Sequence, residues 1–121
     1  GQFASQKKDY DKAADYLSKA LALAKDDNAK IAINASIGQC WFYKAQDRVA
    51  AVKGVLSPAA RAQFNEVYNK AISYLEAAKQ LDTLKEQKSS WAYPLYGCYY
   101  FVKGAQAPET LEAASIAGVQ Q

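Results

Sequence analysis

The chain has 121 residues, of which 50% are hydrophobic, and its 15 basic and 12 acidic side chains give a net charge of +3. This length suits a single domain with a buried core, and three prolines and six glycines are too few for a linker or a disordered tract. Acidic and basic residues are interspersed, which is unlike the clustered basic surface of a nucleic-acid binder. The sequence contains no run of about 18 uncharged apolar residues, the length that a membrane-spanning helix needs.

Helical residues dominate the composition. Alanine, leucine, lysine, glutamine and tyrosine are abundant, whereas Val, Ile and Thr are too sparse and irregular for strands, so an all-α fold is predicted. The first helix is predicted over 10–24, where apolar residues recur every three or four positions, and Asp26-Asp27-Asn28 ends it. A second helix is predicted from about 29 to 53, where Gly54 stops it.

Three further helices follow. Ser57-Pro58 supplies an N-cap hydroxyl and a proline at the first helical position, so a third helix is predicted from there to about Leu81. A fourth begins near residues 89–90 and ends at Lys103-Gly104. Pro108-Glu109 begins a short fifth helix.

Chemistry-bearing motifs are missing from the sequence. Cys40 and Cys98 both lie in helical, aromatic stretches, which favours two buried free thiols over a disulfide. The chain has no histidine, no Gly-x-Ser-x-Gly, no P-loop and no Cys-x-x-Cys, and carboxylates such as Asp9, Glu66 and Glu76 fall in an exposed helical charge pattern. No catalytic residue, metal or cofactor is therefore predicted, and the chain is not expected to be an enzyme.

One phrase occurs twice. The segment Tyr10–Leu23 reads YDKAADYLSKALAL, and Tyr68–Leu81 reads YNKAISYLEAAKQL. We call them the first and the second copy. Aligned at an offset of 58 residues they share seven identities, namely two tyrosines, one lysine, two alanines and two leucines. Self-similarity at a fixed spacing is the signature of a repeat architecture.

Two glycine motifs extend this pattern into a family resemblance. Ile37-Gly38-x-x-Trp41 and Tyr96-Gly97-x-x-Tyr100 match the Leu-Gly-x-x-Tyr pattern of the tetratricopeptide repeat, and Gly1 holds the same position in a truncated first unit. The Tyr, Ala, Leu and Ala of each copy match the second-helix pattern of that family. Small residues let neighbouring helices approach closely, so Gly38 and Gly97 are predicted to be packing glycines. The resemblance implies an α-α superhelix of about two and a half repeats.

The resemblance also implies boundaries within a single domain. The repeats are expected over 1–28, with a truncated first helix, over 29–85, and over 86–121, which is partial. Because Gly1 would lie inside a first helix, the chain is expected to be the C-terminal part of a longer array. The incomplete first repeat would leave an apolar face that two chains could cover by forming a homodimer.

The second repeat is longer than the standard 34 residues. The excess lies over 45–67 and is interpreted as a helical extension, a hairpin that projects beyond the solenoid. Its two sides are expected to pack through apolar residues, with Val49, Val52 and Leu56 facing Phe64 and Val67.

A partner groove follows from the family's concave face, which first-helix residues line. The carried-over positions are Gln2, Ser5 and Gln6 in the first repeat, Ala35, Gln39, Phe42 and Tyr43 in the second, and Trp91, Pro94, Cys98, Phe101 and Val102 in the third. Pro94 is expected in about the first turn of its helix, where a proline is tolerated. A chaperone-adaptor subclass clamps a C-terminal carboxylate with Lys and Asn, but Ala35 and Gln39 stand there in this chain, so that clamp is not expected.

Two functions remain open at this point. The resemblance implies a non-catalytic scaffold that binds an extended or helical segment of a protein partner. Alternatively, the aromatic stretch around Trp91–Phe101 could stack on a glycan or another small ligand, although Trp91, Tyr96, Tyr99 and Tyr100 are expected mainly to pack against the preceding helix pair. The chain is rich in lysine and tyrosine and has an elongated middle helix pair, and in this it resembles bacterial repeat proteins of the cell envelope. The resemblance implies a location in the periplasm or cell envelope.

Overall fold

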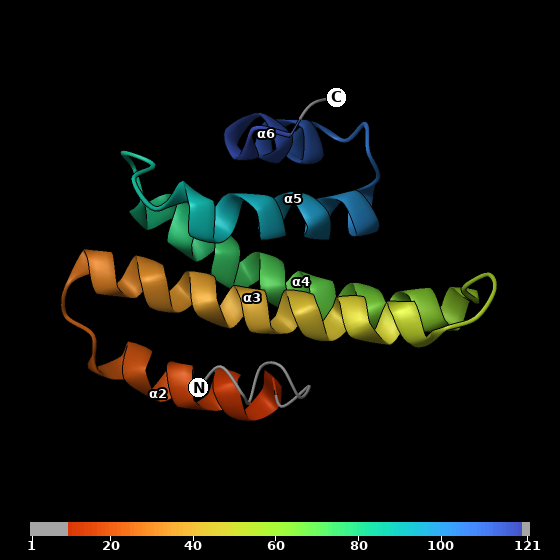
Figure 1. Ribbon diagram of the computed structural model, residues 1–121, viewed down its shortest axis with the longest axis horizontal. Helices are drawn as coiled ribbons and strands as arrows, with labels where there is room; N and C mark the ends of the chain where they lie inside the picture. The colour runs from red at the N-terminus through yellow and green to blue at the C-terminus, as the bar shows by residue number, and fades with distance from the viewer. Residues whose placement is uncertain (1–9, 120–121) are drawn as a thin grey trace.

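The computed structural model describes residues 10–119, and within them it is entirely helical apart from turns (Figure 1). The helices are α2 (Tyr10–Leu23), α3 (Asp27–Ala51), α4 (Pro58–Leu81), α5 (Lys88–Lys103) and α6 (Pro108–Ala117). The predicted all-α class is confirmed, and every helix end predicted from the sequence lies within two residues of its observed position.

The helices stack in chain order. The long helices α3 and α4 lie side by side at the centre, α2 packs against α3 on one side, and α5 packs against both long helices on the other (Figure 1). The short helix α6 covers α5 and is the outermost layer. Consequently α4 lies between α3 and α5, whereas α2, within the described part of the chain, packs mainly against α3.

Local signals set the helix ends. The side chain of Ser57 accepts a hydrogen bond from the backbone N–H of Ala60 at 3.1 Å, and Pro58 follows at the first helical position, as predicted. The helix α3 ends at Ala51, slightly before the expected stop at Gly54, and Gly54 lies in the following turn with a φ of 86°. Gly104 has a φ of 95° and ends α5, because such a backbone suits a residue without a Cβ.

The extension of α3 and α4 is helical on both sides of its turn and projects past the ends of α2 and α5 (Figure 1). Val49, Phe64 and Val67, three of the five residues expected to pack across the hairpin, are partly buried and lie against the core. Val52 does not, because α3 ends before it and its side chain is 37% exposed.

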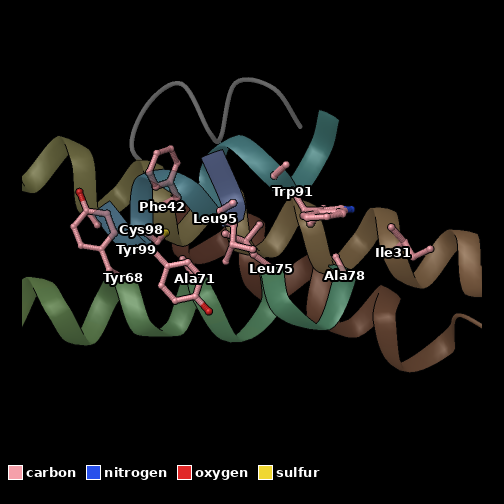
Figure 2. Close-up of a cluster of buried hydrophobic side chains, with 14 residues drawn as sticks. Ile31, Phe42, Tyr68, Ala71, Leu75, Ala78, Trp91, Leu95, Cys98 and Tyr99 are labelled. Atoms are coloured by element: carbon pink, nitrogen blue, oxygen red, sulfur yellow. The ribbon is translucent and has the colours of Figure 1, made fainter. Parts of the chain in front are cut away.

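Apolar side chains form two clusters. The main core lies among α3, α4, α5 and α6 and includes Trp91, Leu75, Leu95 and Phe42 (Figure 2). A smaller cluster joins α2 to α3 and is built on Tyr10, Ala14, Ile37 and Cys40. Cys40 and Cys98 are buried and free, as the sequence predicted. Burial raises the pKa of both thiols, which keeps them protonated at neutral pH.

Both motif glycines are packing glycines, but they contact different kinds of neighbour. A Cβ on Gly38 would lie 2.5 Å from Cγ of Leu75, which is on the following helix α4. A Cβ on Gly97 would lie 2.6 Å from Cε1 of Phe42, which is on α3, two helices earlier in the chain. The predicted close packing is confirmed, yet the two Gly-x-x-aromatic motifs do not occupy equivalent positions in the stack.

Candidate interaction surface

Most of the predicted groove residues lie in the core. Ala35 and Trp91 have no exposed surface and Phe42 is 2% exposed, so for these three the expected place in an open groove is corrected to a place between helices. Pro94 and Cys98 are also buried. Among the described residues, the predicted positions that reach the surface are Gln39, Phe101 and Val102, which are partly buried, and Tyr43, which is 43% exposed. Gln2, Ser5 and Gln6 lie outside the described residues.

Gln39 has a structural partner that the sequence did not reveal. The helix α5 begins at Lys88, so Pro94 lies in its second turn and not in its first. A proline has no N–H, and the carbonyl of Ser90 therefore lacks its usual helical donor. Nε2 of Gln39 donates to that carbonyl at 2.6 Å across the α3–α5 contact. Gln39 thus supplies the hydrogen bond that Pro94 removes, and it fixes α5 on α3.

Trp91 is held from the other side by a buried carboxylate. Nε1 of Trp91 donates to Oδ2 of Asp82 at 2.9 Å, and Asp82 is 4% exposed. The same carboxylate accepts from the backbone N–H groups of Glu86 at 3.0 Å and Gln87 at 2.8 Å. Burial acts to raise the pKa of Asp82, but these three hydrogen bonds and the charge of Lys85 outweigh it and hold the pKa below its usual value. We call Asp82 and its partners the Asp82 clamp.

The exposed face of α5 carries a row of three tyrosines. The ring centroids of Tyr93 and Tyr96 are 6.1 Å apart, and those of Tyr96 and Tyr100 are 5.8 Å apart. Tyr93 is 58% exposed and Tyr100 is 52% exposed, while Tyr96 between them is partly buried. Within residues 10–119 none of the three hydroxyl groups has a hydrogen-bond partner. We call these residues the tyrosine row.

The sequence predicted the packing of part of this aromatic stretch. Trp91 and Tyr99 are buried as expected and Tyr96 packs partly against the core, whereas Tyr100 faces solvent. The spacing of three and four residues does place the row on one helix face, opposite Trp91 and Cys98. Because both faces of α5 are rich in aromatic side chains, hydrophobicity alone could not show which of them would be buried.

A depression with a cavity volume of about 440 Å³ lies at the C-terminal end of α5. It is lined by Arg61, Tyr100, Phe101, Val102, Lys103 and Gly104. The guanidinium carbon of Arg61 lies 5.0 Å from the ring centroid of Phe101, and its Nη1 donates to the carbonyl of Phe101 at 3.5 Å. Since Tyr100 belongs both to this lining and to the tyrosine row, the two features form one continuous surface.

No protein-family model, characterised protein or solved structure matched this chain when it was compared with them. Among residues 10–119, no helix is long and apolar enough to cross a membrane. In the same part of the chain, no three His, Cys, Asp or Glu side chains come together as metal ligands would.

Proposed function

We propose that the protein is a non-catalytic interaction scaffold, a tetratricopeptide-like stack of helices in which the tyrosine row contacts a segment of a protein partner. The observation that carries the proposal is a run of three adjoining aromatic rings on one helix face, of which the outer two, Tyr93 and Tyr100, are more than half exposed. Tyrosine is enriched at protein interfaces, because its ring buries apolar area while its hydroxyl finds a polar partner.

The surface is also rigidly presented, which supports the same proposal. The Asp82 clamp fixes the N-terminal half of α5 against α4, and the hydrogen bond from Gln39 to Ser90 fixes it against α3. These contacts hold α5 itself, so the helix that carries the row is already positioned when a partner binds.

A peptide library displayed on phage tests this proposal. Peptides are selected on the wild-type protein, and the dissociation constants of the best binders are measured for Tyr96→Ala and Tyr100→Ala. Each substitution is expected to weaken binding by about ten-fold or more, as for a central aromatic contact. Tyr16→Ala is the matched control, because Tyr16 is a 73% exposed tyrosine on the distant helix α2. Failure to select any peptide, or equal effects of all three substitutions, would contradict the proposal.

A glycan is a second candidate ligand for the same row. The free hydroxyl groups and accessible rings of Tyr93 and Tyr100 favour it, because sugars bind by stacking on aromatic rings and by hydrogen bonding. Titration calorimetry with a panel of neutral oligosaccharides tests this candidate. Saturable binding that Tyr96→Ala removes would support it, and heats equal to dilution across the panel would eliminate it.

A further inference from the structure

We propose that Arg61 receives a carboxylate of the partner, so that the bound segment is an amphipathic helix whose apolar face lies on the tyrosine row and whose acidic side chain enters the depression beside Tyr100. This inference rests on the proposed function and deepens it, because it states the chemistry of the partner.

Arg61 has more N–H donors than the surrounding structure uses. A guanidinium group carries five N–H donors in a planar fork that matches a carboxylate. Within residues 10–119 the group forms a single weak hydrogen bond, in which Nη1 lies 3.5 Å from the carbonyl oxygen of Phe101. Among the described residues no carboxylate forms an ion pair with Arg61. Its charge and most of its donors are therefore available to a ligand.

Lys103, the other cation that lines the depression, differs from Arg61 in having a charge partner. Nζ of Lys103 lies 3.0 Å from Oε2 of Glu109, so this charge already has a partner within the chain. In the part of the chain that the structure describes, Arg61 is thus the one lining cation without an ion pair, and a single positive charge is balanced by one carboxylate and not by a multiply charged phosphate. Contact with the ring of Phe101 holds the guanidinium in place before binding.

The length of the tyrosine row along α5 indicates the shape of the ligand. From Tyr93 to Tyr100 the helix rises by roughly 10 Å, which is about two turns. A partner helix that packs along α5 would match this length with apolar side chains at positions i, i+3 or i+4, and i+7. Because the row ends at Tyr100 in the lining of the depression, the acidic residue of the partner is expected about one turn beyond its last apolar contact.

The test uses peptides selected from a phage library of short helical sequences. The selected sequences are expected to share an Asp or Glu about one turn beyond a two-turn apolar stripe. Fluorescence anisotropy of the best peptide then gives its dissociation constants for the wild type, Arg61→Gln and Arg48→Gln. Arg48 is the matched control, because it is an exposed arginine on the extension of α3 and does not line the depression. Thermal unfolding followed by circular dichroism confirms that each variant folds.

Arg61→Gln is expected to weaken binding by about ten-fold and Arg48→Gln by less than two-fold. Replacing the acidic residue of the peptide by its amide should weaken binding to the wild type but not to Arg61→Gln, since the two changes remove the same contact. Equal effects of the two arginine substitutions, or selected peptides without an acidic residue, would overturn this inference and leave the proposed function standing if Tyr96→Ala still weakens binding by about ten-fold or more. A library that yields no binder would overturn both.

Discussion

The two copies of the repeated phrase share seven identities but occupy different environments. In the second copy, on α4, Ala71, Leu75 and Ala78 have no exposed surface. In the first copy, on α2, the corresponding alanines and leucine are only partly buried, and Leu23 is 80% exposed. The cause is the packing around each helix, since α4 lies between α3 and α5, whereas α2 packs mainly against α3 among the described helices. The same sequence therefore makes a core helix or a surface helix according to what packs on it.

The exposed side of α2 bears directly on self-association. Tyr16 is 73% exposed and Leu23 is 80% exposed, so this helix presents apolar surface to solvent. Pairing of two chains through this face stays a prediction, which sedimentation velocity over a range of concentrations would check.

The largest expected effect comes from truncating the shared leucine in each copy. Leu75→Ala leaves a cavity in the main core and should lower the free energy of unfolding by about 3 to 4 kcal/mol. Leu17→Ala removes a partly buried side chain at the edge of the smaller cluster and should lower it by only about 1 kcal/mol. Urea unfolding of both variants measures the difference. Equal losses would mean that α2 is covered as completely as α4.

The Asp82 clamp follows the second copy, whereas Ala24 stands at the same position after the first copy. Asp82→Asn should lower the free energy of unfolding by about 2 kcal/mol at pH 7, because the hydrogen bonds lose their charged acceptor. The pKa of Asp82 is below its usual value of 3.8 in the folded state, so its contribution is present above pH 3.8 and is lost as the pH falls through the folded pKa. Melting temperatures between pH 7 and pH 2 should thus fall more steeply for the wild type than for Asp82→Asn, and parallel profiles would contradict this account.

The hydrogen bond from Gln39 to Ser90 joins α5 to α3, the helix that precedes the second copy. Gln39→Ala leaves the carbonyl of Ser90 without a donor and should lower the free energy of unfolding by about 1 to 2 kcal/mol. Pro94→Ala restores a backbone N–H at the helical position. In that background Gln39→Ala should have a smaller effect, which a double-mutant cycle measures as a coupling of about 1 kcal/mol. Strict additivity would show that Gln39 does not compensate for Pro94.

The two motif glycines provide a finer comparison. A Cβ on Gly38 would meet both Leu75 and, at 3.3 Å, the backbone carbonyl of Ala71, which cannot rotate away. A Cβ on Gly97 would meet only the far side of the Phe42 ring. After the gain of about 1 kcal/mol in helix propensity, Gly38→Ala should destabilise by roughly 1 to 2 kcal/mol and Gly97→Ala by less. The reverse order in thermal or urea unfolding would contradict the close approach of α3 and α4.

The smallest expected effect concerns the tyrosine that begins each copy. Burial, strengthened by a 2.9 Å hydrogen bond to Asp47, raises the pKa of Tyr10 to about 12, and burial raises that of Tyr68 to about 12 as well. Stability from both groups is complete below pH 10 and is lost as the pH rises towards 12. Asp47→Asn should lower the pKa of Tyr10 while leaving that of Tyr68 unchanged, and Tyr10→Phe should lower the free energy of unfolding by about 1 kcal/mol. The ultraviolet absorbance of ionised tyrosine is followed during a pH titration of the wild type, Tyr10→Phe and Tyr68→Phe. The transition that is missing in each variant assigns its pKa to that tyrosine.

The sequence by itself determined where the helices lie. The Ser57 cap, Pro58, Pro108 and the stop at Gly104 act through neighbouring backbone groups, so their effect is readable without the fold. The need for small residues at Gly38 and Gly97 was also readable, because a glycine inside a helix is unfavourable unless a neighbour approaches closely.

Only the tertiary structure decided which faces are buried and which partners meet. Phe42 was expected in an open groove and instead fills the space over Gly97, and Gln39 meets the carbonyl that Pro94 leaves free. These contacts depend on how α5 is rotated and placed against α3, which no local signal specifies. Since both faces of α5 are aromatic, its amphipathic pattern could not select between burying Trp91 and burying Tyr100, and packing against α4 and α6 made that choice.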